Sequence, residues 1–251
     1  MMLSWYRRNA ADFGFGRATA LLLRVVWRRA FVKTCNSLLP RRVECPCCGW
    51  CGNQFHDYIE IGYAIRNIEC PVCGSHSRHR GFFLWLTRDY QIQSKSGTAL
   101  LFAPERALAS LWASNPSLTP HRLDIQSGRD VDLIADIMHL PFAPDSARLI
   151  WCHHVLEQVS NDLLALDELR RVLKTGTGHL ILSVAVNGEV TREFGAADKR
   201  LSNNRRSYGA DFVKRLQDAG LAVHMLSYGL NQQELARYGV LSEPFYMCVK
   251  N

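Results

Sequence analysis

The sequence of 251 residues lacks an apolar run long enough to cross a membrane. Its best candidate lies within residues 1–44 and is interrupted by Arg17, Arg24, Arg28 and Arg29, whereas a spanning helix needs about 20 predominantly apolar residues. The same arginines, together with Asp12, argue against a secretory signal peptide. We therefore expect a cytoplasmic protein whose association with a membrane, if there is one, is peripheral.

Low-complexity segments and internal repeats are also missing, and 47% hydrophobic against 21% charged residues exclude a disordered chain. This length can hold one full α/β domain plus a smaller module. The formal net charge is +7, but residues 1–44 carry nine Lys and Arg against two acidic residues, and the rest balances 21 against 21. The excess of positive charge therefore lies in the N-terminal segment. It gives little support to the hypothesis that the rest of the chain binds nucleic acid.

The N-terminal segment, residues 1–44, is expected to form one or two helices that end near residues 38–42. Apolar residues at positions 22, 23 and 26 lie roughly opposite arginines at positions 17, 24 and 28, but Arg29 and Lys33 break into the apolar face. A helix packed on the rest of the protein is the favoured interpretation. The alternatives are a peripheral contact with an anionic membrane surface, favoured by Trp5, Trp27 and Phe31, and a mitochondrial presequence.

Nine cysteines without an export signal favour metal binding or reduced thiols over disulfides. The segments CPCCG (45–49) and CPVCG (70–74) each have the form of a metal knuckle, in which two thiolates grip one ion and a glycine permits the sharp turn. A strand-like stretch separates them. The pattern predicts a zinc ribbon over residues 45–80 with a structural, four-thiolate Zn²⁺ site formed by Cys45, Cys48, Cys70 and Cys73.

Two further thiols, Cys47 and Cys51, leave the ligand set open, because Cys48 and Cys51 also have knuckle spacing. The repeated Pro and Gly favour Cys45 and Cys48. Iron in a rubredoxin-like site and unmetallated surface thiols are the alternatives. A module of about forty residues cannot fold on its core alone, so metal binding of roughly 10–16 kcal/mol would supply the missing stability.

The central segment, residues 130–173, reads as strand, acidic turn, strand and then a helix with apolar residues at helical spacing. Strands alternating with helices predict a mostly parallel sheet. In such sheets a ligand binds beyond the carboxyl ends of the strands. Asp136, His153, His154 and Glu157 all fall at that edge, which makes them candidate site residues.

Three segments in order, ADIMHLPF (135–142), IWCHHVLE (150–157) and LRRVLK (169–174), resemble the middle of a class I S-adenosylmethionine-dependent methyltransferase of the type 11 group. The resemblance implies a Rossmann-like sheet, mostly parallel with an antiparallel last strand, and S-adenosylmethionine as cofactor. It implies that Asp136, followed by Ile137, lies near the adenine. It also implies that His153 and His154 line the reacting face.

The second knuckle continues as SHSRHR (75–80), which alone could be a phosphate- or RNA-binding loop. Together, knuckle and SHSRHR resemble a bacterial group of these methyltransferases in which a cysteine-rich ribbon precedes the catalytic domain. The resemblance implies that His76 and His79 are interdomain or substrate-side residues. The expected division is a basic helical segment (1–44), a zinc ribbon (45–80), a linking helix (81–96) and an S-adenosylmethionine-binding domain (97–251).

No glycine follows the first strand predicted in that domain, residues 98–102, where class I methyltransferases usually have a glycine-rich turn. The ribbon-bearing group also carries Ala-Pro-Glu there, so the turn of Phe102, Ala103, Pro104 and Glu105 is expected to meet the methionine part of the cofactor. Asp124 ends the strand predicted over 121–124. We expect it to accept hydrogen bonds from the ribose hydroxyls, the alternative being a solvated or helix-capping aspartate.

A polar segment, residues 187–207, is expected to be a loop that carries substrate contacts over this edge. In the ribbon-bearing group this loop ends in Asp-His-x-Arg-x-Tyr-Gly, and here the segment is NNRRSYG (203–209). The aspartate and histidine are missing. Arg206 and Tyr208 remain and are predicted to be substrate-side residues.

Methyl transfer is a displacement on a sulfonium, so the protein mainly aligns the acceptor, and a base is needed only where the acceptor loses a proton. His154 is the first candidate base because imidazole titrates near neutral pH, and His153 is the second. We expect an enzyme that methylates oxygen or nitrogen of a small molecule or glycan precursor. The alternatives are an RNA methyltransferase that holds nucleic acid with its ribbon and basic segment, and a catalytically inert adaptor.

Overall fold

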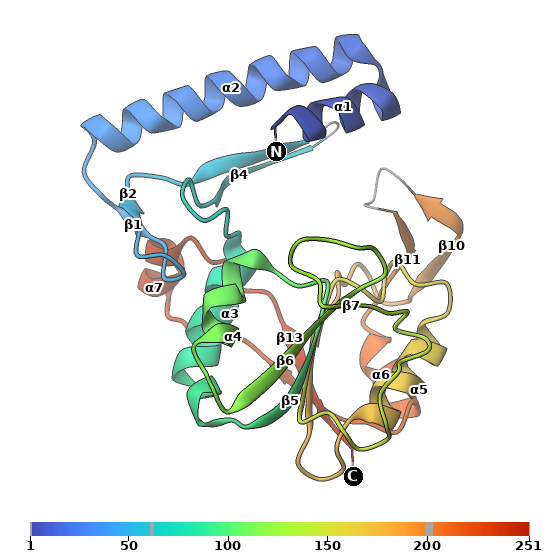
Figure 1. The fold of residues 1–251 in the computed structure, drawn as a ribbon. Helices are drawn as coiled ribbons and strands as arrows, with labels where there is room; N and C mark the ends of the chain where they lie inside the picture. The colour runs from blue at the N-terminus through green and yellow to red at the C-terminus, as the bar shows by residue number, and fades with distance from the viewer. Residues whose placement is uncertain (1, 61–62, 199–202, 251) are drawn as a thin grey trace. The chain divides into compact units, whose positions relative to one another are not determined.

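The computed structural model describes residues 2–60, 63–198 and 203–250. The chain folds into two compact units: an N-terminal unit, formed by Met1–Asp89 and Gly229–Ser242, and a sheet unit, formed by Tyr90–Tyr228 and Glu243–Asn251. Figure 1 shows the helices and strands of both.

The N-terminal unit begins with two helices, α1 (Met2–Phe13) and α2 (Phe15–Leu38), where one or two were predicted. Gly14, with φ 89°, provides the reversal between them, and α1 folds back beside the first part of α2 (Figure 1). The Tyr6 hydroxyl and Thr19 Oγ1 lie 2.9 Å apart across the pair. Among the described helices, none has the length and apolar character to cross a bilayer.

Two small antiparallel ribbons follow. One pairs β1 (Val43–Glu44) with β2 (Cys51–Gly52), and the other pairs β3 (His56–Glu60) with β4 (Tyr63–Glu69). The chain then enters α3 (Ser77–Arg88). The predicted linking helix over 81–96 is therefore shifted. It starts earlier because the N–H of His76 donates to His79 Nδ1 at 2.9 Å, and such a side chain reaching back stabilises a helix start.

The segment Gly229–Ser242, which contains α7 (Gln232–Tyr238), packs with the N-terminal unit. Arg80 donates to the carbonyl oxygens of Tyr238 and Gly239 at 2.6 and 2.8 Å. The N–H of Leu241 donates to Ser77 Oγ at 2.7 Å. This segment, predicted to lie within the domain over 97–251, thus packs with the N-terminal unit through polar groups.

The sheet unit is built on a seven-stranded sheet with the order β12-β13-β9-β8-β5-β6-β7. Neighbours among β9, β8, β5, β6 and β7 are parallel, and β13 is antiparallel to both β9 and β12. The predicted fold class, mostly parallel with an antiparallel last strand, is confirmed. The strands are β5 (Gly97–Phe102), β6 (Leu118–Asp124), β7 (Leu133–Ile134), β8 (Leu149–His153), β9 (His179–Ser183), β12 (Ala222–Leu226) and β13 (Phe245–Val249).

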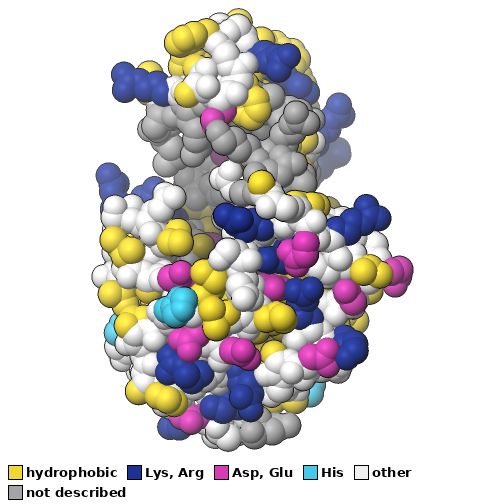
Figure 2. Space-filling model, turned by 90° about the vertical axis from the view of Figure 1, so that its right-hand side faces the viewer, with side chains coloured by type: hydrophobic (Ala, Val, Ile, Leu, Met, Phe, Trp, Pro, Cys, Tyr) yellow, Lys and Arg dark blue, Asp and Glu magenta, His cyan; other side chains and the backbone are white. Residues whose placement is uncertain are grey.

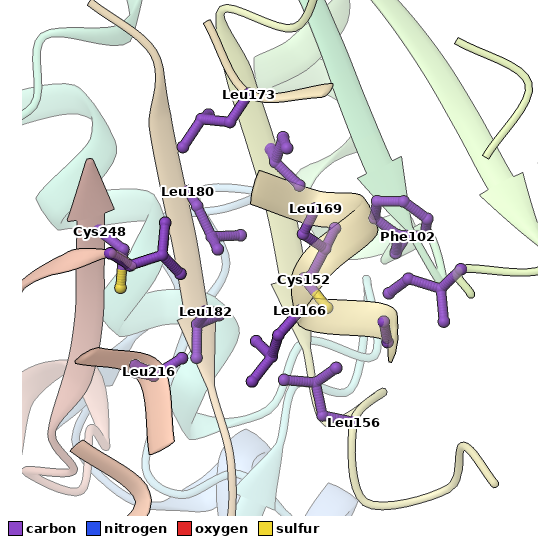
Figure 3. Packing of buried hydrophobic residues seen from close by; sticks show 14 of the residues in the cluster. Phe102, Cys152, Leu156, Leu166, Leu169, Leu173, Leu180, Leu182, Leu216 and Cys248 are labelled. Atoms are coloured by element: carbon purple, nitrogen blue, oxygen red, sulfur yellow. The ribbon is translucent and has the colours of Figure 1, made fainter. Parts of the chain in front are cut away.

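Helices cover both faces of this sheet. On one face α5 (Asp162–Val172) and α6 (Phe212–Asp218) contribute to a buried apolar core, in which Leu169 of α5 and Leu216 of α6 lie with Cys152 of β8 and Leu182 of β9 (Figure 3). On the other face a tryptophan of α4 (Ala109–Ala113) packs edge-on against Trp151 of β8, with ring centroids 5.2 Å apart. Two short 3-10 turns, η1 (Ile92–Ser94) and η2 (Arg106–Leu108), complete the unit.

The polar segment over 187–207 contains an antiparallel hairpin of β10 (Arg192–Asp198) and β11 (Asn204–Ser207), where a loop was expected. The N–H groups of Arg205 and Arg206 donate to the carbonyl oxygen of Glu157 at 2.7 and 3.3 Å. These bonds tie β11 to the loop after β8. The sequence of the hairpin has no alternation of apolar and polar residues, so its two strands could not be predicted from the sequence.

Candidate functional site

A cavity of about 330 Å³ opens at the carboxyl edge of β5, β6 and β8. Its volume lies at the lower end of the range typical of small-ligand sites. It brings together six residues that the sequence singled out: Phe102, Ala103, Asp124, Asp136, Ile137 and His154. The cavity thus lies where ligands bind in open parallel sheets.

The turn after β5 forms one wall without any glycine. Ala103 has φ 47°, in the left-handed region that non-glycine residues rarely adopt. Its N–H donates to the carbonyl oxygen of Leu123 at 2.9 Å, which fixes this turn to the end of β6. The chain thus makes a turn usually left to glycine with the smallest side chain that has a Cβ, so a ligand can still approach the main chain closely.

Two half-buried carboxylates also line the cavity. Asp124 accepts the N–H of Gln126 at 3.0 Å, and Asp136 accepts the N–H of Met138 at 2.9 Å. Within the described part of the chain, neither forms an ion pair with Lys or Arg. Each carboxylate therefore keeps acceptor capacity for hydroxyl or amino groups of a ligand.

His154 directly follows β8 with φ 53°, and its side chain lines the cavity. Its Nδ1 lies 3.0 Å from Oε1 of Glu157, whose side chain is almost fully buried. The same Oε1 accepts the N–H of Ala185 at 2.9 Å, so the carboxylate is held in place from two sides. An ionised carboxylate can only accept a hydrogen bond, so in a neutral imidazole Nδ1 carries the hydrogen and Nε2 has the free lone pair.

Three other residues predicted for the site do not line the cavity. His153 is buried, its Nδ1 2.7 Å from Ser183 Oγ and its ring 4.1 Å from that of Trp151. Glu105 lies close enough to accept a hydrogen bond from Trp151 Nε1, at 3.3 Å. Pro104 and Glu105 are half-buried and flank the Ala103 turn. Their role in cofactor binding stays a prediction.

Arg206 and Tyr208, predicted to be substrate-side, are buried in a polar network. Arg206 donates to the carbonyl oxygens of Leu156 and Val159 at 2.6 and 2.8 Å. The Tyr208 hydroxyl donates to Asp162 at 2.7 Å, and burial, with Asp162 nearby, raises the pKa of Tyr208. Both side chains therefore anchor the hairpin, and a direct substrate contact by either one stays a prediction.

Sequence reasoning missed Arg205, Gln158 and Ser160, which also line the cavity. Arg205 precedes the buried Arg206 in β11, and successive strand residues point to opposite faces. This alternation could have identified Arg205 only if β11 had been recognised as a strand. No sequence pattern indicated Gln158 or Ser160.

A second site lies in the N-terminal unit, where Sγ atoms of Cys45, Cys48, Cys70 and Cys73 all lie within 4.8 Å of one another. Two of the separations are 3.6 Å, Cys45 to Cys73, and 3.7 Å, Cys48 to Cys70. A tetrahedral ion with Zn–S bonds of about 2.3 Å requires sulfurs about 3.8 Å apart. The four thiols fit such an ion, and this is the set favoured by the repeated knuckle motif.

The surroundings of this cluster match a structural site. Gly49 and Gly74 both have left-handed φ, 73° and 71°, as the knuckle turns require. Ser75 Oγ lies 3.1 Å from Cys45 Sγ and 3.2 Å from Cys73 Sγ, where it can support the ligands from outside. Cys51 Sγ instead contacts the carbonyl oxygen of Gly49 at 3.7 Å.

The SHSRHR segment does not form an open anion-binding loop. Arg80 is fully buried and donates to four carbonyl oxygens, those of Ile68, Ser75, Tyr238 and Gly239. Its guanidinium also lies 3.9 Å from the ring centroid of Phe55. Burial lowers the pKa of Arg80. The residue is an internal cross-link of the N-terminal unit.

Comparison with known proteins agrees with this geometry. The family model described as "Methyltransferase domain" (Methyltransf_11) matches residues 95–182. These residues run from β5 to β9 and include most of the cavity wall. No curated protein sequence gives a significant match.

Among solved structures, the [4+2]-cyclase SpnF is 16% identical, with 72% of this chain and 84% of SpnF covered and a TM-score of 0.50. A Haloferax volcanii protein solved in complex with the Trm112 methyltransferase activator is 17% identical, covering 68% and 93%, with a TM-score of 0.44. An S-adenosylmethionine-dependent methyltransferase from Aquifex aeolicus is 16% identical, covering 67% and 93%, with a TM-score of 0.45.

The family match and the sheet order show a methyltransferase domain with a Rossmann-like fold. The chain carries this domain together with a four-cysteine cluster that fits a zinc ribbon. The resemblance drawn from the sequence motifs is confirmed on both points.

Proposed function

We propose that the protein transfers the methyl group of S-adenosylmethionine to an oxygen or nitrogen atom of a small molecule or glycan precursor. The observation that carries this proposal is the cavity at the carboxyl edge, which combines two carboxylates that form no ion pair among the described residues with a histidine held by a buried glutamate. The family match adds the cofactor class.

The residues present fit S-adenosylmethionine. Asp124 would accept the ribose hydroxyls and Asp136, with the apolar Ile137, would hold the adenine end, while the Ala103 turn would meet the methionine part. The fit rests on the donor and acceptor chemistry of the wall, since both carboxylates keep acceptor capacity beyond their single main-chain bonds. When bound, this cofactor supplies an electrophilic methyl group on a positively charged sulfur.

His154 is the candidate general base. Glu157 holds Nδ1, which leaves Nε2 as the atom that can take a proton from the acceptor. This role is needed for a hydroxyl acceptor and is dispensable for an amine that is already neutral. We assign His153 a structural role, in which its contact with Ser183 joins the ends of β8 and β9, and not a role in proton transfer.

The acceptor end of the cavity is marked by Gln158, Ser160 and Arg205. These groups offer hydrogen bonds and one positive charge, which suits a polar acceptor. Arg206 and Tyr208 would hold β11 so that Arg205 stays at the wall. Acidic and basic side chains are interspersed on the face of the sheet unit in Figure 2, an arrangement that favours a small polar acceptor over RNA.

The test measures S-adenosylhomocysteine formed from S-adenosylmethionine by the zinc-loaded full chain, with fractionated small-molecule extract or with total RNA as acceptor. We expect product with the small-molecule fraction. His154→Gln should lower the rate on the order of 100-fold where a base is needed. His224→Gln, at an exposed position on β12, should leave the rate unchanged.

Two results would overturn the proposal. Product formed only with RNA would make the protein an RNA methyltransferase. A folded protein that binds no cofactor and forms no product with either fraction would be an adaptor. The likeness to SpnF, a cyclase by its name, shows a shared fold alone, so the assay must detect methyl transfer itself.

A further inference from the structure

The helix α2 buries one face against its own unit and leaves a second apolar face outward. Ala18, Leu21 and Val32 are buried at 0%, 7% and 0% exposure. Leu23, Trp27 and Phe31 are 65%, 63% and 45% exposed. These last three follow one another at i, i+4 and i+8, so they form a single stripe along the helix.

The stripe is continuous and aromatic. Trp27 and Phe31 stack with ring centroids 5.9 Å apart. Val26, at 47%, widens the stripe, and Leu38, at 77%, extends it by two further turns. A soluble helix normally places polar residues on its outward face, and a contiguous exposed apolar surface indicates an interaction site.

Two ion pairs fix which face points outward. Arg28 pairs with Asp57 of β3 at 2.8 Å, and Arg29 pairs with Glu69 of β4 at 2.9 Å. The sequence alone placed Arg29 within the apolar face. Because Arg29 turns inward to Glu69, the stripe is uninterrupted by charge.

The borders of the stripe are basic. Arg17 and Arg24 lie exposed along one side of it, and Lys33 lies exposed along the other. Residues 15–38 contain no acidic residue. On the face drawn in Figure 2, hydrophobic and basic side chains lie side by side on the described part of the N-terminal unit.

We propose that this outward face of α2 binds the surface of an anionic membrane, with the stripe of Leu23, Val26, Trp27, Phe31 and Leu38 inserted at the level of the headgroups. Basic borders complement anionic lipid, and Trp and Phe are favoured at the boundary between headgroups and acyl chains. A helix of 24 residues, about 36 Å long, would lie in the plane of the interface. This proposal does not depend on the reaction proposed above.

The experiment is sedimentation of the zinc-loaded full chain with vesicles of phosphatidylcholine alone, or of phosphatidylcholine and phosphatidylglycerol at a 3:1 ratio. We expect binding to the anionic vesicles that weakens at least 10-fold when the salt concentration is raised from 0.1 to 0.5 M. The emission of Trp27 should shift to shorter wavelength on binding, and Trp27→Phe identifies its contribution.

Two variants distinguish the contribution of the apolar stripe to vesicle binding from that of the basic residues. Leu23→Glu combined with Trp27→Glu should abolish binding, and Arg17→Gln combined with Arg24→Gln should weaken it while leaving the apolar stripe intact. Leu163→Glu, at an exposed leucine of α5, is the matched control and should bind as the parent does. Circular dichroism checks that each variant is folded.

Three outcomes would overturn the proposal. The first is recovery of the parent protein only in the supernatant, and the second is a stripe variant that binds as tightly as the parent. The third is a parent protein that binds no vesicles and is a dimer by light scattering, while the stripe variant is a monomer. That result would make the face an interface between two copies of the chain.

Discussion

Oε1 of the buried Glu157 lies 3.0 Å from Nδ1 of His154, at the wall of the cavity. Glu157 fixes the imidazole without lining the cavity itself, which makes it a positioning residue. Replacing the carboxylate by an amide of the same size removes the negative charge that holds the Nδ1 proton.

We therefore expect Glu157→Gln to lower kcat for a hydroxyl acceptor on the order of 10-fold while the affinity for S-adenosylmethionine stays the same. Steady-state kinetics and calorimetry measure the two quantities separately. Glu189→Gln, at an exposed glutamate of the same unit, is the control. Loss of cofactor affinity, or an unchanged kcat, would show that Glu157 does not act through His154.

The sheet and its cavity were predictable because the residues that build them carry local signals. Asp136 precedes a Leu-Pro-Phe turn, and the helix after β8 has a clear helical period. The positions of Asp124 and His154 at the cavity were predictable because the carboxyl ends of parallel strands meet at one edge of the sheet.

Other features were not predictable because they depend on long-range polar contacts. Nothing in the sequence around Arg80 indicates that its guanidinium is buried against carbonyl groups 158 and 159 residues away. Such a contact leaves no periodic pattern in the sequence. The same holds for Arg29, whose partner Glu69 lies 40 residues further along the chain.

Loss of the metal should unfold the N-terminal unit. Cys73→Ser removes one of the four thiolates, and binding of roughly 10–16 kcal/mol is the usual contribution of such a site to folding. We expect the variant to be purified without stoichiometric zinc and to lose hydrogen-exchange protection in α2 and β4. Cys51→Ser, which removes a thiol outside the cluster, should retain both. Equal zinc content in the two variants would contradict the ligand assignment.

Arg80 should be among the most costly positions to replace in the N-terminal unit. Arg80→Met removes the side-chain donor of four carbonyl oxygens, of which that of Ser75 keeps the N–H of Cys70 as a donor. We expect a loss of about 3–5 kcal/mol in the free energy of unfolding, because each buried group left without a partner costs about 1–3 kcal/mol and the effects are not fully additive. Urea denaturation measures it, with Arg66→Met at an exposed site of β4 as the control. A loss below 1 kcal/mol would refute the cross-link.

His179 should make stability depend on pH. Burial, and then the charges of Lys95 and Arg148, lower the pKa of His179, and the Tyr90 hydroxyl lies 2.8 Å from its Nδ1. Below the ordinary histidine pKa of about 6.5, the unfolded chain takes up a proton at this position before the folded chain does, so stability falls as the pH falls.

His179→Gln should therefore flatten the decline in unfolding free energy between pH 7 and pH 5. Urea denaturation over that range, on the parent and the variant, measures the difference. His224→Gln, at an exposed position, should follow the parent. A variant with the parent's slope would show that His179 does not contribute.

The central claim is that the cavity binds S-adenosylmethionine, and calorimetric titration of the zinc-loaded protein with S-adenosylmethionine and S-adenosylhomocysteine tests it most directly. The account predicts binding of both by the parent and by Asp167→Ala, an exposed aspartate of α5, and no binding by Asp136→Ala. Absence of binding to the folded parent, or undiminished binding by Asp136→Ala, would contradict it.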